Sequence, residues 1–338
     1  MSISEIIPGQ CIGGCRIRRL LGRGLSSEVY LGEHPEISDS VAVKLLYAWT
    51  GEREVQRFLT QAAMLSKLDH PRIIHIYDFG LTDDDVPYLV VSYAPYGTLR
   101  QRYPRGSRLP LHEVVGYVIQ AADALQYVHE HQLVHRDVKP QNMLLGTHGE
   151  IILNDFGTTT VSYSLIPNAV DFEGTVLYAA PEQLEGRSLR GSDQYALAVM
   201  THELLTGSWP FIGTFDEVAR KHLFEQPPTV RDKGLDIPVP VEEALQRALC
   251  KDPSGRFACI QDFADALQAA SGPASSTRAQ QDAPVRKQFR SPLPFIAHDT
   301  GNSPASLQIL PRPLGHGSAR QHMSRYSGCL ILWPEYTL

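Results

Sequence analysis

The sequence has no long hydrophobic run and no regular pattern of cysteines. Nowhere in its 338 residues do about eighteen apolar residues follow one another, which is the length that a membrane-spanning helix needs. Segment 1–10 lacks the basic start and the long apolar core of a signal peptide. Five cysteines, an odd number without regular spacing, argue against a disulfide framework and fit a reducing compartment. We therefore expect a cytoplasmic protein without a membrane span.

The chain also lacks an excess of positive charge. Its 31 Lys and Arg are outnumbered by 37 Asp and Glu, so the net charge is −6 at pH 7. A broad basic field, which would attract nucleic acid or an anionic membrane, is therefore absent from the chain as a whole. No nucleic-acid partner is expected, and any basic groove would have to be local.

The composition changes near residue 271. Up to about residue 270 the chain alternates patterned segments with short turns, whereas 271–338 is rich in Pro, Ser, Gln and Arg without periodicity. Such a composition is typical of disordered segments. Segment 272–338 holds seven Lys and Arg against three Asp and Glu. A basic tail of this kind could fold back or bind an acidic partner, and it could equally be a solvated linker.

Hydrophobic periodicity divides the patterned part into two regions. In the first region, β-branched and apolar runs between turn residues predict strands with one helix among them: strands over 16–21, 28–32, 41–46, 74–79 and 88–92, and the helix over 52–68. In the second region, apolar residues recur at helical spacing and predict helices over 112–131, 192–206, 215–225, 241–249 and 260–270. The sequence therefore predicts an α+β fold.

The most informative segment runs from His135 to Asn142 and is followed, after twelve residues, by Asp155. Transfer of a phosphoryl group requires neutralised charge, an aligned donor and acceptor, and a carboxylate that takes the acceptor's proton. Asp137, Lys139, Asn142 and Asp155 are the residue types for this work. The segment therefore indicates phosphoryl transfer from a nucleotide.

This segment resembles the catalytic loop and the magnesium-binding motif of eukaryotic-type (Hanks-type) serine/threonine protein kinases. The resemblance implies that Asp137 orients the acceptor hydroxyl and accepts its proton, and that Lys139 stabilises the transferring phosphate. It also implies that Asn142 and Asp155 hold Mg²⁺. His135 and the residue after Asp155 are then expected to have packing roles.

The resemblance covers about residues 11–268 and looks like the bacterial branch of that family, because the domain is compact and its insertions are short. It implies a two-lobed protein kinase fold followed by a disordered tail, with the N-lobe at about 11–93, the C-lobe at about 94–270 and the tail at 271–338.

Segment 21–30 lies between two expected strands, where the family's glycine-rich loop covers the nucleotide phosphates. Glycines let backbone N–H groups approach phosphate oxygens, although the third family glycine is Ser27 here. Lys44 lies on the third expected strand and corresponds to the family lysine that binds the α- and β-phosphates. The resemblance implies an ATP site lined by Leu21, Gly22, Gly24, Val29, Ala42, Lys44, Val91, Tyr93, Ala94 and Leu144.

The clearest departure from the family pattern is in the helix after Lys44. The family places a glutamate there as the partner of the lysine, and the spacing leads to Gln61. An amide can accept a bond from Lys44, but that bond is neutral rather than charge-assisted. We expect the helix to be held more weakly by about 1 to 2 kcal/mol.

Segment 174–182 resembles the end of the activation segment, which forms the platform for protein substrates. The resemblance implies that Glu182 and Arg256 form a buried ion pair, and that Asp193 is a structural aspartate. Hydroxyl groups before and within this segment are candidates for autophosphorylation, or belong to a merely polar loop: Thr158, Thr159, Thr160, Ser162 and Thr175.

The resemblance thus implies a serine/threonine protein kinase that uses ATP and Mg²⁺ to phosphorylate proteins. One alternative is a nucleotide-binding pseudokinase, in which Gln61 and Ser27 have weakened catalysis and the fold serves as an interaction module. Another is a small-molecule phosphotransferase, against which segment 174–182 argues. The substrate, the upstream signal and the oligomeric state are left open by the sequence.

Overall fold

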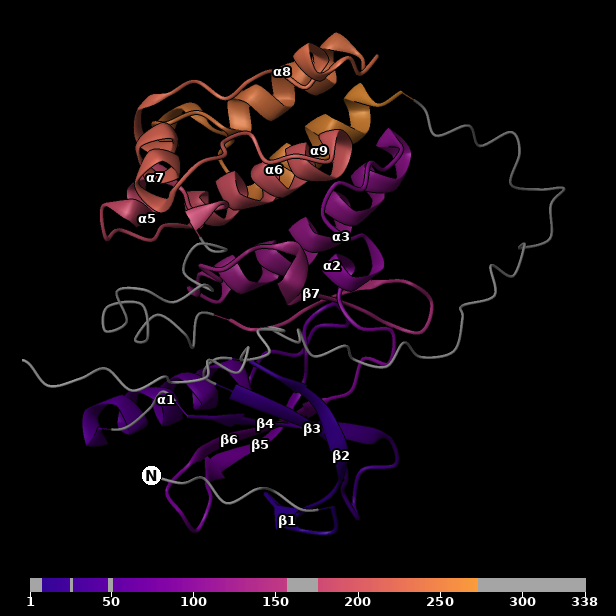
Figure 1. The fold of residues 1–338 in the computed structure, drawn as a ribbon, viewed down its shortest axis with the longest axis vertical. Helices are drawn as coiled ribbons and strands as arrows, with labels where there is room; N and C mark the ends of the chain where they lie inside the picture. The colour runs from indigo at the N-terminus through magenta and orange to yellow at the C-terminus, as the bar shows by residue number, and fades with distance from the viewer. Residues whose placement is uncertain (1–7, 25–26, 48–50, 157–175, 273–338) are drawn as a thin grey trace, which may run out of the picture. The chain divides into compact units, whose positions relative to one another are not determined.

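A six-stranded antiparallel sheet forms the N-terminal part of the protein (Figure 1). The computed structural model describes residues 8–24, 27–47, 51–156 and 176–272, all of which belong to one structural unit. The strands lie in the order β1-β2-β3-β4-β6-β5, and their bounds are β1 (Cys11–Ile12), β2 (Cys15–Arg23), β3 (Ser27–Glu33), β4 (Ser40–Leu46), β5 (Ile76–Leu81) and β6 (Pro87–Ser92).

Each face of this sheet has its own apolar cluster. Helix α1 (Glu52–Leu65) packs on one face, where Phe58 and Ala62 are fully buried against Leu46 and neighbouring side chains of β5 and β6. The opposite face carries Tyr30, Val43 and other buried residues of β2, β3 and β4. The sheet is thus closely packed on both faces, with α1 on one of them.

The C-terminal part is mostly helical and is arranged around α6 (Arg190–Thr206) (Figure 1). Every residue from Ser192 to Thr206 is buried, which makes α6 the central helix of this part. The surrounding elements are α2 (Leu99–Arg102), α3 (Leu111–Glu130), α5 (Pro181–Leu184), α7 (Phe215–Phe224), α8 (Val239–Ala248), α9 (Ile260–Ala270), the strands β7 (Met143–Leu145) and β8 (Ile151–Leu153), and the 3-10 turns η1 (Pro140–Asn142), η3 (Arg231–Lys233) and η4 (Pro253–Gly255).

Backbone hydrogen bonds join the two parts at the hairpin of β7 and β8. The Ile74 N–H donates to the Leu153 carbonyl oxygen at 2.9 Å, and the Leu153 N–H donates to the Arg72 carbonyl oxygen at 2.8 Å. The Leu145 N–H donates to the Gly97 carbonyl oxygen at 2.9 Å. This hairpin therefore holds the catalytic loop, which precedes it, directly beside the sheet.

The predicted α+β fold with a β-rich N-lobe and a helical C-lobe is confirmed. All the predicted strands and helices are present, with ends that differ by up to three residues. The prediction missed the short elements β1, α2, β7, β8 and α5. The predicted disordered tail lies outside the described residues, apart from 271–272.

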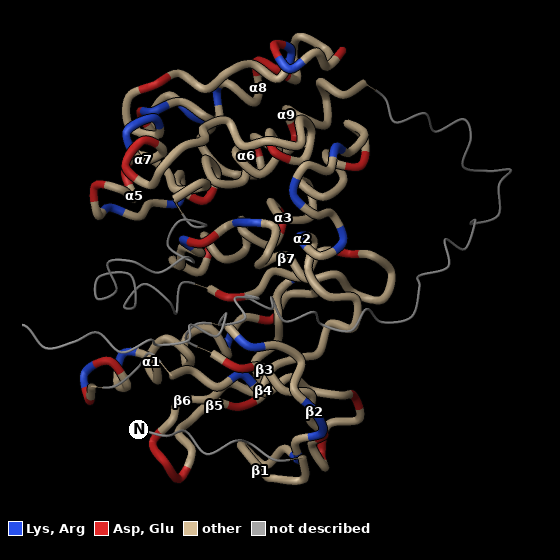
Figure 2. Tube along the Cα trace, in the orientation of Figure 1, with Lys and Arg blue, Asp and Glu red and all other residues tan. Residues whose placement is uncertain are grey.

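Acidic and basic residues are interspersed along the described chain, in line with its modest net charge (Figure 2). Within the described ranges, no helix is both long enough and apolar enough to cross a membrane.

Candidate active site

The catalytic loop gathers three predicted residues around one carboxylate. Asp137 is 9% exposed, and the Asn142 Nδ2 donates both to its Oδ2 at 2.9 Å and to its backbone carbonyl at 2.7 Å. The Lys139 Nζ lies 2.9 Å from the same Oδ2. The carboxylate is therefore held in one orientation by an amide and an ammonium group.

Asp193 of α6 fixes the backbone of this loop, as predicted for the structural aspartate. Its carboxylate accepts from the N–H of His135 at 2.9 Å and from the N–H of Arg136 at 2.8 Å. The His129 Nε2 lies 2.7 Å from the same carboxylate. Arg136 has a φ of 71°, a conformation that costs energy for a residue with a side chain. The bonds to Asp193 stabilise this conformation of Arg136. The buried helix α6 therefore positions the loop.

The His135 ring links the loop to the segment that carries Asp155. Burial lowers the pKa of this fully buried ring, although the nearby carboxylates of Asp193 and Asp137 oppose the shift. The neutral ring has its Nε2 3.0 Å from the Asn154 carbonyl oxygen and accepts from the Asp137 N–H at Nδ1, at 3.3 Å. It also packs on Phe156 with ring centroids 4.8 Å apart, which confirms the predicted packing roles.

Lys44 and Asp155, which are 111 positions apart in the sequence, form an ion pair across the two parts of the fold. Burial would raise the pKa of Asp155, but the Lys44 ammonium, helped by Lys139, outweighs burial and holds the pKa below its usual value. Asp155 adopts a φ of 58°, a conformation found mainly at turns and functional sites. The pair places a cation and an anion where phosphates and a metal ion would have to bind.

Gln61 does not accept the bond from Lys44 that its amide could have accepted. The Gln61 Oε1 is buried and has no hydrogen-bond partner in the described part of the chain. Lys44 bonds to Asp155 instead, because a carboxylate is a stronger acceptor for an ammonium group than an amide is. An unpaired buried carbonyl costs about 1 to 3 kcal/mol. The position of α1 is therefore less favourable than a paired side chain would make it.

A cavity of about 180 Å³ lies between the sheet and the β7–β8 hairpin. All the predicted ATP-binding residues line it except Gly22 and Gly24: Leu21, Val29, Ala42, Lys44, Val91, Tyr93, Ala94 and Leu144. The ion pair of Lys44 and Asp155 stands in its wall, and Arg19 is a further charged residue of a mostly apolar lining. Such a slot suits a flat heteroaromatic ring attached to a charged group.

The cavity includes residues that the sequence did not single out. Leu65, Ile76 and Leu89 belong to the cluster beneath α1 and extend the slot past Val91, as the small side chain of that residue allows. Leu65 is part of α1, so the position of that helix shapes the slot directly. Apolar lining from distant strands and from a helix could not be paired from sequence spacing alone.

Three groups in the cavity lining and the hairpin already have hydrogen-bond partners within the protein. The Ser92 N–H donates to the His75 carbonyl at 2.9 Å, so it is unavailable to a nucleotide. The Thr98 hydroxyl accepts from the Gln101 N–H at 3.1 Å and caps α2. The Gly24 N–H donates to the Ser27 carbonyl at 2.7 Å and closes the hairpin.

Asn142 and Asp155 fit the predicted role of magnesium ligands. Mg²⁺ prefers oxygen ligands and is usually held by one or two protein groups together with phosphates. Both amide hydrogens of Asn142 are directed at Asp137, which leaves its Oδ1 as the atom that could hold a cation. The carboxylate of Asp155 lies in the cavity wall.

The predicted activation-segment residues Thr158, Thr159, Thr160, Ser162 and Thr175 lie outside the described residues.

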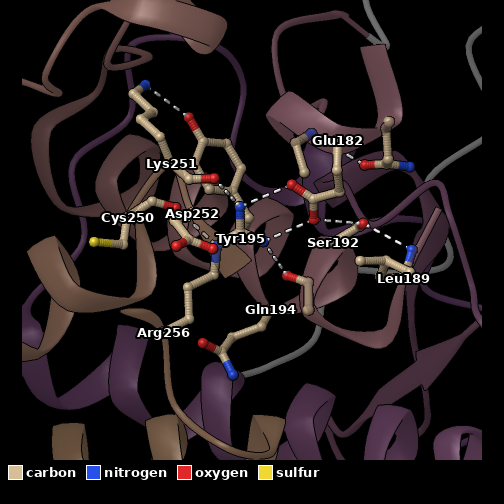
Figure 3. A network of polar contacts seen from close by, with 12 residues as sticks. Glu182, Leu189, Ser192, Gln194, Tyr195, Cys250, Lys251, Asp252 and Arg256 are labelled. Carbon is tan, nitrogen blue, oxygen red and sulfur yellow. Dashed lines mark hydrogen bonds and ion pairs between the residues drawn. The ribbon is translucent and has the colours of Figure 1, made fainter. Parts of the chain in front are cut away.

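The predicted ion pair that anchors the end of this segment is confirmed (Figure 3). Arg256 donates to both carboxylate oxygens of Glu182 at 2.8 Å, and Ser192 donates to one of them at 2.7 Å. The amide of Gln183 in α5 donates to the Arg136 carbonyl at 3.0 Å.

A second polar cluster beside this anchor was not predicted from the sequence. Arg100 of α2 donates to Glu203 of α6 at 2.6 Å and to the Tyr178 hydroxyl at 2.8 Å. Tyr178 also bonds to Glu203 and accepts from the Trp209 Nε1 at 2.9 Å. The four residues come from four separate segments, so only the folded chain reveals that the charge of Glu203 is neutralised.

His222 joins α7 to the same region. Its Nδ1 accepts from the Tyr195 hydroxyl at 2.9 Å, and its Nε2 donates to the Leu177 carbonyl at 3.2 Å. Burial, with a contribution from the positive Lys251, lowers the pKa of His222 to about 3. The ring is therefore neutral in the folded protein and protonated in the unfolded chain below about pH 6.5.

The free energy of unfolding should consequently fall as the pH falls from about 6.5. The unfolded state binds more protons than the folded state between the two pKa values, so His222 alone should cost about 2 kcal/mol between pH 7 and pH 5. Urea unfolding at both pH values measures this loss, which His222→Gln should reduce. The exposed His112→Gln is the control, and an equal pH dependence in both variants would contradict the assignment.

Comparison with known proteins adds to this geometry. A family model described as a protein kinase domain matches residues 15–268. The chain is 35% identical over 256 residues to the serine/threonine-protein kinase PrkC of Bacillus subtilis, a match that covers 74% of this chain and 39% of PrkC. It is 38% identical over 277 residues to the serine/threonine-protein kinase PknF of Mycobacterium tuberculosis, covering 77% of this chain and 56% of PknF.

A solved structure is similar as well. The crystal structure of the PknI kinase domain of Mycobacterium tuberculosis matches with a TM-score of 0.64 at 29% identity, covering 79% of this chain and 100% of that domain. The matches to PrkC and PknF, in contrast, cover less than two thirds of the length of those proteins.

Proposed function

Since this chain belongs to the protein kinase domain family, with bacterial serine/threonine kinases among its relatives, we propose that it transfers the γ-phosphate of ATP to serine and threonine hydroxyls of proteins. The observation that carries the proposal is the Asp137 carboxylate, which Asn142 and Lys139 hold in one orientation. A cavity suited to adenine adjoins this loop, and Lys44 and Asp155 stand in its wall. Base, cation and metal-binding groups are thus present together.

In the proposed reaction the acceptor oxygen forms a bond to the γ-phosphorus as its proton passes to Asp137. The bond between that phosphorus and the bridging oxygen breaks, and ADP leaves with the electron pair. Lys139 stabilises the negative charge on the transferring group, and Lys44 binds the remaining phosphates. Bound Mg²⁺ would supply further charge neutralisation, with Asn142 and Asp155 as its protein ligands.

The direct test is transfer of radiolabelled γ-phosphate from ATP, with and without Mg²⁺, to the protein itself and to a generic protein substrate. We expect Mg²⁺-dependent labelling of serine and threonine in both. Mass spectrometry of the labelled chain should place phosphate between residues 157 and 176, because Arg136 is exposed and has no ion-pair partner among the described residues. No labelling under any of these conditions, with ATP still bound, would overturn the proposed activity.

A second candidate function is a nucleotide-binding pseudokinase. The unpartnered Oε1 of Gln61 favours it, because α1 then lacks the charged bond that would hold it against Lys44. In that case ATP binds, no phosphate is transferred, and the fold serves as an interaction module. Titration with ATP in the absence of transfer distinguishes this function from the first.

Gln61→Glu should raise the rate of transfer by about 5- to 30-fold. A carboxylate at this position can pair with Lys44 and stabilise α1 by about 1 to 2 kcal/mol, the difference between a charged and a neutral hydrogen bond. The exposed Gln56→Glu on the same helix adds the same charge away from Lys44 and is the matched control. Equal rates for the two variants would show that the missing carboxylate does not limit the reaction.

A further inference from the structure

A buried carboxylate stands at the base of the glycine-rich hairpin. Glu28 on β3 is 8% exposed and follows Ser27, which replaces the third glycine of the family pattern. It accepts from the hydroxyl of Tyr30 at 2.7 Å and from that of Tyr47 at 2.5 Å, and it pairs with Arg23. A buried carboxylate is tolerated only when its oxygens are bonded, so these three partners hold Glu28 in place.

The pair of Arg23 and Glu28 closes the hairpin across its two strands. The two residues are directly opposite each other in the register of β2 and β3. Arg23 lies between Gly22 and Gly24, whose backbones have the greatest freedom in this segment. The salt bridge therefore acts at the position where the hairpin is intrinsically least rigid.

The side chain of Glu28 lies on the face of the sheet opposite the cavity. Successive side chains of a strand point to opposite faces, so Glu28 and Tyr30 share one face of β3 and Val29 lies on the other. Val29 lines the cavity, whereas Tyr30 belongs to the apolar cluster on the far side of the sheet. Glu28 thus faces away from the cavity.

We propose that Glu28 is a positioning residue for the triphosphate of ATP. It ties the end of β2, through Arg23, to the hydroxyl groups of Tyr30 and Tyr47, and so fixes the described ends of the hairpin beside the phosphates. The inference rests on the proposed function, because it assumes that ATP occupies the cavity.

The charge state of Glu28 agrees with this role. Burial opposes ionisation, but the hydroxyl groups of Tyr47 and Tyr30 and the guanidinium of Arg23 outweigh burial and hold the pKa of the carboxylate below its usual value. Glu28 is therefore negative at neutral pH and pairs with Arg23 throughout the physiological range.

The same two strands provide a matched control. At their other end Arg18 and Glu33 form a second ion pair, and both side chains are half exposed, at 50% and 53%. The pair has the same chemistry and joins the same strands, but it lies away from Gly22 and Gly24, and no hydroxyl group among the described residues bonds to it. An effect confined to Glu28 and Arg23 therefore reports the position of the hairpin and not the stability of the sheet.

The experiment is isothermal titration calorimetry of the full chain with ATP and Mg²⁺, and separately with adenosine. We expect Glu28→Gln and Arg23→Gln each to weaken ATP binding about tenfold, the size of one charged hydrogen bond. Adenosine binding should stay within about twofold, because adenosine lacks the phosphates, and Glu33→Gln should change neither. Arg23 is 59% exposed, so its variant should fold even where Glu28→Gln is destabilised.

The outcomes separate this inference from the proposed function. ATP affinities equal to that of the parent in both variants would overturn the inference alone. Equal losses for ATP and adenosine would also overturn it, because they indicate general damage to the cavity. A parent protein that binds adenosine but not ATP would overturn the proposed function and this inference with it.

Discussion

Replacement of Asp137 by asparagine should lower the rate of phosphoryl transfer by about 10²- to 10⁴-fold, the usual contribution of a general base. The amide has the shape of the carboxylate but cannot take the proton of the acceptor hydroxyl. It also removes the negative partner of Lys139. The affinity for ATP should change little, because Asp137 is not among the residues that line the cavity. Single-turnover transfer with radiolabelled ATP, together with calorimetry, measures both quantities.

The exposed Asp236→Asn is the control, since it removes the same charge from the surface of the same protein. A transfer rate in Asp137→Asn above about one tenth of the parental rate would be incompatible with a role as the base. A parallel loss of ATP binding and of the urea midpoint would instead indicate a structural role. The bonds from Asn142 make that result unexpected, because asparagine retains an acceptor oxygen.

The catalytic loop could be predicted from the sequence because its members are close together along the chain. Asp137, Lys139 and Asn142 lie within six positions, so a single short turn brings them together. Their contacts with one another are therefore local, whereas Asp193 of α6 holds the backbone of the loop. Asp193 was also predicted, although only the structure shows that it accepts two backbone N–H groups of the loop.

The partner of Lys44 could not be predicted in the same way. The choice between Gln61 and Asp155 depends on where α1 lies relative to the hairpin of β7 and β8, and sequence spacing does not determine this. The family pattern supplied a position and a contact for the helix residue, but Gln61 does not make that contact. The carboxylate of Asp155 is a stronger acceptor for the Lys44 ammonium group than the amide of Gln61 is, so Lys44 bonds to Asp155.

The burial of isolated polar residues also could not be predicted from the sequence. Glu28 lies in a strand whose polar and apolar residues follow an ordinary strand pattern. Its burial depends on Tyr47, which follows the end of β4. The short strands β7 and β8 have three residues each, too few for a period of two to be recognised. Glu28 nevertheless holds the glycine-rich hairpin in place, and β7 and β8 hold the catalytic loop beside the sheet.

The anchor of the activation segment should dominate the stability of the C-terminal part. Arg256→Met is expected to lower the free energy of unfolding by about 3 to 5 kcal/mol, because it leaves the carboxylate of Glu182 buried without its cation. The guanidinium also donates to three backbone carbonyls, of Cys250, Gly191 and Lys251, at 2.8, 2.8 and 3.1 Å. Urea unfolding at pH 7 measures the loss.

An exposed pair provides the control for this prediction. Arg187 and Glu185 are 67% and 51% exposed, so Arg187→Met should cost less than about 1 kcal/mol. The double variant Glu182→Gln with Arg256→Met should lose less than the sum of its single variants, since no unpaired charge then stays buried. Additive losses would mean that Arg256 stabilises the protein through its bonds to the backbone carbonyls and not through its pairing with Glu182.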